Sequence, residues 1–163
     1  MSTIEKSVRV QVPVRTAYDQ WTQFETFPEF MGGVKHVKQL DDKHLHWKAE
    51  IAGVEREWDA EIVHQEPDER VSWRAIDGAQ NDGTVSFASI GTDEAQVSLR
   101  MEFDPEGLVE NVADAGNVIE MQVERDLEKF KEFIEHREAE TGAWRGSVKP
   151  TGDVDPGPDQ STI

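Results

Sequence analysis

The chain has 163 residues, no cysteine, and 34 acidic against 17 basic residues, which gives a formal net charge of −17 at pH 7. Its length fits one domain with a core of ordinary size, and the lack of cysteine excludes disulfides, thiolate metal ligands and thiol catalysis. The acidity, without any run of Lys or Arg, argues against nucleic acid as a partner, and no stretch is long and apolar enough for stable membrane insertion or a signal peptide, so we expect a soluble cytoplasmic protein.

The N-terminal part predicts a strand followed by two short helices. Residues 3–12 alternate between apolar and polar side chains, which is typical of a half-buried strand. Pro13 then stands where a helix can begin, and the apolar residues after it fall on one helical face. A second short helical piece is expected around residues 28–31, ended by Gly32 and Gly33.

From residue 34 to residue 103 the pattern changes to period two. Turn-forming residues such as Asp41-Asp42 and Gly91-Thr92-Asp93 separate the alternating segments. Short turns between successive strands predict an antiparallel meander. The expected strands are residues 34–40, 44–51, 54–64, 70–76, 83–90 and 95–103.

A long amphipathic helix is predicted from Val118 to Arg137. Its apolar stripe consists of Ile119, Val123, Leu127, Phe130 and Ile134. Asn117 resembles a helix cap and Gly142 a stop signal, and a short helical lead-in is expected over residues 108–113. The Gly/Pro/Asp-rich residues after Gly142 lack the apolar surface to form a core, so we expect one domain over residues 1–142 and a disordered tail over residues 143–163.

This order of elements is that of an α+β helix-grip fold, in which a curved antiparallel sheet of about six or seven strands wraps around a long C-terminal helix. The chain resembles the START-like superfamily, and within it the polyketide cyclase/dehydrase-like proteins known as SRPBCC proteins. The resemblance covers roughly residues 3–140. It is carried by the segments 4–31, 46–62, 67–73, 103–107 and 126–135.

The resemblance implies an apolar cavity between sheet and helix that holds a hydrophobic small molecule, lipid-like or polyketide-like. Strand alternation places tryptophans of three successive strands on the inner face, where they either line the cavity or fill it. The predicted ligand contacts are Trp47, Arg56, Trp58, Trp73, Met101 and Phe103 from the sheet, Ile119, Val123 and Leu127 from the helix, and Phe30 and Met31 at the mouth.

Arg56 is the unusual member of this set, because strict alternation with Trp58 places a guanidinium on the inner face, where an unpaired charge is costly. It either reaches water at the cavity mouth or meets a carboxylate or a polar group of the ligand. An alternative function is therefore a cyclase or dehydrase that acts on a polyketide-like substrate with Arg56 as the electrophilic group. A further alternative is a stress or assembly protein that recruits a partner through its acidic surface.

The sequence contains no motif for covalent or cofactor chemistry. It has no Gly-x-Ser-x-Gly nucleophile motif, and Gly32-Gly33 precedes a predicted strand instead of a phosphate-binding helix. His44 and His46 have a spacing that can support a metal, but they share their strand face with Lys48 and Glu50. We expect no metal and no cofactor.

Overall fold

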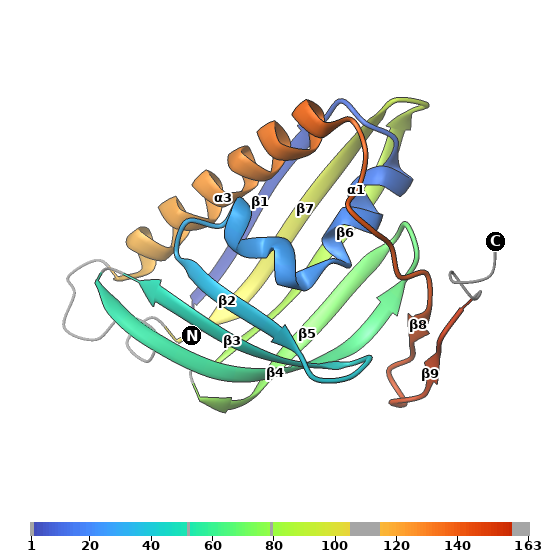
Figure 1. The fold of residues 1–163 in the computed structure, drawn as a ribbon. Coiled ribbons are helices and arrows are strands. Elements are labelled where there is room, and N and C mark those ends of the chain that lie inside the picture. Colours follow the sequence, from blue (N-terminus) through green and yellow to red (C-terminus); the bar gives the residue numbers. More distant parts are fainter. Residues whose placement is uncertain (1, 52, 79, 105–114, 158–163) are drawn as a thin grey trace.

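The computed structural model describes residues 2–51, 53–78, 80–104 and 115–157. Its elements form one large antiparallel sheet, two short helical pieces and one long helix (Figure 1). In chain order they are β1 (Ser2–Val10), α1 (Val14–Trp21), the 3-10 helix η1 (Phe24–Glu29), β2 (Val34–Gln39), β3 (His44–Ile51), β4 (Val54–Glu66), β5 (Arg70–Gly78), β6 (Asn81–Gly91), β7 (Glu94–Phe103), α3 (Ala115–Arg137), β8 (Ser147–Val148) and β9 (Val154–Asp155).

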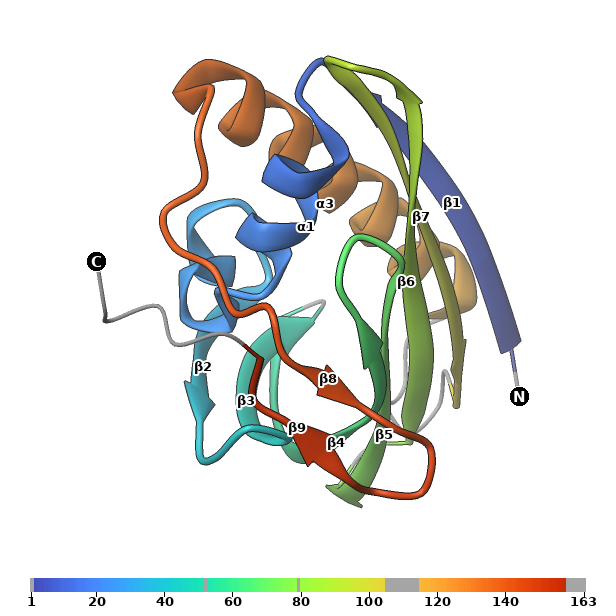
Figure 2. The same cartoon turned by 90° about the vertical axis from the view of Figure 1, so that its right-hand side faces the viewer.

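The sheet has the strand order β1-β7-β6-β5-β4-β3-β2, so the first strand of the chain lies beside the last strand of the meander. Every neighbouring pair is antiparallel. The register shifts twice along β4, between Asp59 and Ala60 and between Ile62 and His64, and such irregularities bend a sheet. The curved sheet partly encloses α3, α1 and η1 (Figures 1 and 2), which confirms the predicted helix-grip fold.

The long helix begins and ends at other residues than the sequence predicts. It starts at Ala115, so Asn117 lies inside the helix and not at its cap. It ends at Arg137 because Glu138 takes a left-handed conformation with φ of 64°, and the Glu138 backbone N–H donates to the Ile134 carbonyl at 2.9 Å. The stop therefore precedes Gly142, and the lead-in helix predicted over residues 108–113 lies outside the described residues.

Aromatic side chains fill the space between α1, η1 and the C-terminal half of α3. The ring of Phe130 lies 4.9 Å from Trp21 and 5.2 Å from Phe30, measured between ring centres. Phe27 contacts Trp21 at 5.4 Å and Phe30 at 5.6 Å. Because these rings pack edge-to-face or tilted, as aromatic pairs prefer, they form a solid core at this end of the helix.

Residues 143–157, the described part of the predicted tail, contact the rest of the domain. After α3 the chain runs along α1 and forms the β8–β9 hairpin beside β4 (Figure 2), where Val148 pairs with Gln65 and is completely buried. Arg145 supplies the physical reason: its guanidinium donates to Asp19 at 2.6 Å and to both oxygens of Asp68 at 2.9 and 2.8 Å. Composition alone does not reveal this anchor.

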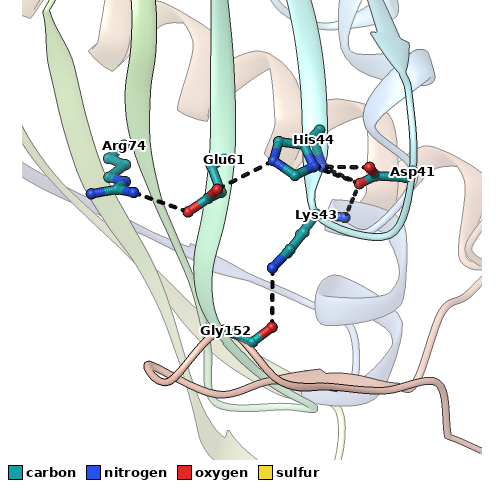
Figure 3. Close-up of polar contacts among 6 residues, drawn as sticks. All are labelled: Asp41, Lys43, His44, Glu61, Arg74 and Gly152. Atoms are coloured by element: carbon teal, nitrogen blue, oxygen red, sulfur yellow. Dashed lines mark hydrogen bonds and ion pairs between the residues drawn. The ribbon is translucent and has the colours of Figure 1, made fainter.

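The outer face of the sheet carries polar networks that also hold the hairpin (Figure 3). Lys43 donates to the Gly152 carbonyl at 3.0 Å. Next to it, the imidazole of His44 lies between Asp41 at 2.9 Å and Glu61 at 3.2 Å, and Glu61 accepts from Arg74 at 3.3 Å. His44 is thus part of a surface ion network that joins β3, β4 and β5.

Candidate ligand-binding site

A cavity of about 160 Å³ lies between the inner face of the sheet and the middle of α3. Its wall is apolar apart from two side chains, Asn81 and Asp126. The aromatic core around Phe130 closes it on the side of the helix C-terminus, as the shared residues Trp21 and Phe27 show. The described residues that line it are Trp21, Phe24, Phe27, Met31, Leu45, Trp47, Trp58, Ile62, Val71, Trp73, Asn81, Leu99, Met101, Val123, Asp126 and Leu127.

Two of the wall tryptophans form a stacked pair across neighbouring strands. Trp47 on β3 lies directly opposite Trp58 on β4, with ring centres 5.8 Å apart and planes inclined by 7°. The ring of Phe27 lies 5.6 Å from Trp47. Because both indoles are held by a neighbour, they present a fixed aromatic surface to the cavity.

Another tryptophan of the wall, Trp73 on β5, is positioned by two neighbouring residues. Its indole N–H donates to the side-chain oxygen of Asn81 at 3.0 Å, and Asn81 is itself buried. On the neighbouring strand the ring covers Gly83, where a Cβ atom would lie only 2.5 Å from Trp73 Cζ2. The absence of a side chain at Gly83 is therefore what makes room for this ring.

Most of the predicted site residues come together around this cavity. Trp47, Trp58, Trp73 and Met101 line its sheet side, Val123 and Leu127 its helix side, and Met31 lies in the wall as well. The tryptophans line a space and do not fill it. Their contact with a ligand stays a prediction.

Four predicted residues do not line the cavity. Phe30 is buried and turns to Phe130 and Phe133 instead. Phe103, at the end of β7, and Ile119 are buried in the core. Ile119 is not in the wall because the cavity reaches only the middle of the helix stripe. Arg56 is half-buried opposite Ala49 and has contacts of its own.

Asp126 is the residue that the sequence reading missed. It lies three residues after Val123 and four before Phe130, which is the spacing of the apolar helix stripe, so a carboxylate at this position was a readable signal. Its Oδ1 accepts from the side-chain amide of Gln122 at 2.7 Å and from the backbone N–H of Gly32 at 3.3 Å. The acid thereby joins α3 to the loop between η1 and β2.

The apolar surroundings change the acidity of this carboxyl. Burial raises the pKa of Asp126 to about 6, although the hydrogen bonds from Gln122 and Gly32 and the charges of Lys129 and Arg125 act in the opposite direction. Desolvation is the larger effect because most of the neighbouring wall is hydrocarbon. The cavity therefore holds one acid that titrates close to neutral pH.

Residues 10–135 match the family described as polyketide cyclase/dehydrase and lipid transport. The chain belongs to this family. It is also 49% identical over 149 residues to an uncharacterized 17.2 kDa protein of Streptomyces lincolnensis, in an alignment that covers 91% of this chain and 99% of the relative.

Solved structures share the fold of this polyketide cyclase/dehydrase family member. The Zhui aromatase/cyclase from Streptomyces sp. R1128 superposes with a TM-score of 0.68 at 17% identity, over 83% of this chain and 94% of that one. A START superfamily protein from Mycobacterium smegmatis gives a TM-score of 0.65 at 16% identity, over 83% and 95% of the two chains. The protein is thus START-like in architecture.

Two further observations concern membrane helices and metal sites. Among the described residues, no helix combines the length and the apolar character needed to cross a membrane. The same part of the chain contains no group of three or more His, Asp or Glu side chains placed to hold a metal ion. His44 and His46 instead contact carboxylates of neighbouring residues.

Proposed function

We propose that the protein binds a hydrophobic small molecule in the cavity between the sheet and α3. The observation that carries this proposal is the cavity itself, about 160 Å³ with an almost wholly apolar wall. Apolar ligand surface that leaves water for such a wall gains about 25 cal/mol per Å².

The volume also restricts the size of the ligand. A buried cavity of about 150 Å³ holds one benzene molecule, and the space here is of that size. The protein in this conformation therefore accommodates a compact ligand of one or two rings and not an extended chain. The rigid indoles of Trp47 and Trp58 favour flat aromatic ligands over branched ones.

A cyclase function receives less support from the same geometry. Arg56, the group suited to polarise a carbonyl, is not among the lining residues. In the described wall only Asn81 and Asp126 carry polar side chains, and Asn81 already accepts the Trp73 N–H. We therefore place binding ahead of catalysis, with Asp126 as the residue to test if turnover is found.

The test uses two variants of one helix. Val123→Phe places a ring in the cavity, whereas Met121→Phe changes an exposed side chain of α3. Ethylbenzene at about a hundredfold excess over its dissociation constant should stabilise the wild type and Met121→Phe by about 2.7 kcal/mol. Val123→Phe should lose most of this gain while keeping its circular dichroism spectrum.

The probes are ethylbenzene, indole and naphthalene. Their binding is measured by thermal unfolding and by tryptophan fluorescence, because four tryptophans lie in the wall. If none of them shifts the melting temperature of the wild type, the cavity does not bind compact apolar compounds and the proposal is wrong. Equal binding to Val123→Phe would place the ligand elsewhere.

A further inference from the structure

The described wall of the cavity contains an acidic side chain and no basic one. Of the described residues that line it, Asp126 alone is ionisable, and the other polar side chain, Asn81, is neutral. A carboxylate in an apolar wall is costly unless its charge is balanced. The wall therefore contains a negative group without a positive counterpart of its own.

The hydrogen bonds of Asp126 leave one of its oxygens open. Gln122 and Gly32 both donate to Oδ1. Within the described residues, Oδ2 accepts no hydrogen bond and the carboxylate forms no ion pair. Lys129 and Arg125, on the same helix, lower the pKa of the acid through space but do not contact it. Oδ2 is thus available to a donor on a ligand.

Aromatic rings make up much of the remaining wall. Trp21 comes from α1, Phe24 and Phe27 come from η1, and Trp47, Trp58 and Trp73 come from the sheet. The face of an aromatic ring attracts a cation, tryptophan most strongly, and more so where water is excluded. A carboxylate and several indoles around one small space form a site that suits an organic cation.

We propose that the cavity selects a compact hydrophobic amine, whose protonated nitrogen pairs with Oδ2 of Asp126 while its apolar body packs against the tryptophans. This inference rests on the proposed function and adds the chemical class of the ligand. Carboxylate and phosphate compounds are repelled both by Asp126 and by the net charge of −17. The same net charge raises the local concentration of cations.

The proposal carries a pH dependence. The groups that face Asp126 are Gln122, Lys129 and Arg125 on α3 and the Gly32 N–H on the loop, and the sheet side of the wall contributes only Asn81. None of these is an acid that would replace its charge. As pH falls through about 6, Asp126 is neutralised, so amine binding should weaken while binding of a neutral hydrocarbon is maintained or strengthened.

Four ligands of nearly equal size test the inference: benzylamine, benzyl alcohol, ethylbenzene and benzoate. At pH 7.5 calorimetric titration of the wild type should give the lowest dissociation constant for benzylamine, about tenfold below that of benzyl alcohol, with benzoate weakest. Asp126→Asn, which keeps an oxygen for Gln122 and Gly32, should remove this preference. Glu128→Gln, which removes an exposed carboxylate from the same helix, should keep it.

The two proposals fail in different ways. If ethylbenzene and benzyl alcohol bind and benzylamine binds no better, the cavity is a hydrophobic site without cation selection and this inference is overturned. A preference for benzylamine that survives in Asp126→Asn overturns it as well, because the cation is then recognised elsewhere. If none of the four compounds binds, the proposed function itself is wrong.

Discussion

Asp126 couples the stability of the protein to pH. Because its pKa is raised from 3.8 to about 6, the folded state favours the neutral acid. The stabilisation from this group is complete below the pKa of the unfolded chain and is lost as pH rises through about 6. Part of the side chain reaches solvent, so we expect a loss of about 1 kcal/mol between pH 5 and pH 7.5, below the full linkage value.

Asp126→Asn should remove that loss. Urea unfolding at both pH values should show the variant gaining about 1 kcal/mol more over the wild type at pH 7.5 than at pH 5. Subtracting the unfolding free energy of the wild type from that of Asp126→Asn removes the contribution of the other titrating groups, which both proteins share. Glu128→Gln shows the effect of removing a charge from the exposed side of the helix. A constant difference across this range would show that Asp126 titrates normally.

Gly83 determines the shape of the cavity through Trp73. In Gly83→Ala the new Cβ would lie 2.5 Å from the indole and 2.9 Å from the Arg100 carbonyl oxygen, so the ring has to shift toward the cavity. We expect a loss of about 1 to 3 kcal/mol in unfolding free energy, together with weaker binding of ethylbenzene.

The matched control for Gly83→Ala is Gly91→Ala, on the same strand, where a Cβ would meet no atom within 4 Å. It should change stability by about 0.5 kcal/mol or less. Near-ultraviolet circular dichroism follows the environment of Trp73 in both variants. An unchanged spectrum in Gly83→Ala would mean that the backbone moves and the ring does not.

At the scale of elements, the C-terminal segment of residues 138–157 is held by Arg145. The guanidinium is 13% exposed, and Asp19, one of its two partners, is 2% exposed. Arg145→Met should leave the buried carboxylate of Asp19 with only the more distant Arg15, at 3.6 Å, and cost about 3 kcal/mol. Limited proteolysis should show faster cleavage within this segment, and thermal unfolding should show a lower melting temperature.

Lys149→Met is the control, because Lys149 is an exposed cation in the same segment. It should leave both the cleavage rate and the melting temperature nearly unchanged. If Arg145→Met behaves in the same way, the ion pairs with Asp19 and Asp68 do not hold the segment, and the pairing of β8 with β4 is sufficient.

The elements differ in how far sequence predicts them. Strand alternation and turn residues predicted β2 to β7 to within a few residues, because one buried face fixes the register of a sheet. The contacts of the C-terminal segment were not predicted, since they include those of one arginine with Asp19, 126 residues away in the sequence. Glu138 was overlooked because non-glycine residues seldom end a helix in the left-handed conformation.

The site was predictable only in part, for a related reason. Strand alternation placed Trp47, Trp58 and Trp73 on the inner face of the sheet, and the structure puts them in the cavity wall. Strand alternation cannot tell which inward residues face a cavity and which face other side chains, so Phe103 was included although it is packed in the core. Asp126 was left out of the predicted site, although its spacing from Val123 and Phe130 indicated the apolar stripe.

At the scale of the whole molecule, charge repulsion opposes the folded state. With a net charge of −17, the compact chain brings like charges closer than the unfolded chain does, and salt screens them. Raising NaCl from about 0.05 M to about 0.5 M shortens the screening length from roughly 14 to 4 Å. We expect the melting temperature at pH 7.5 to rise by several degrees.

The isoelectric point provides the control for this effect. Near it the net charge vanishes, so the same increase in NaCl should change the melting temperature little, apart from the weak salting-out of apolar surface. If the rise is equally large at both pH values, salt acts on the hydrophobic core and not on charge. If melting is unaffected by salt at pH 7.5, local ion pairs such as Lys6 with Glu120 and Glu124, which salt weakens, offset the general repulsion.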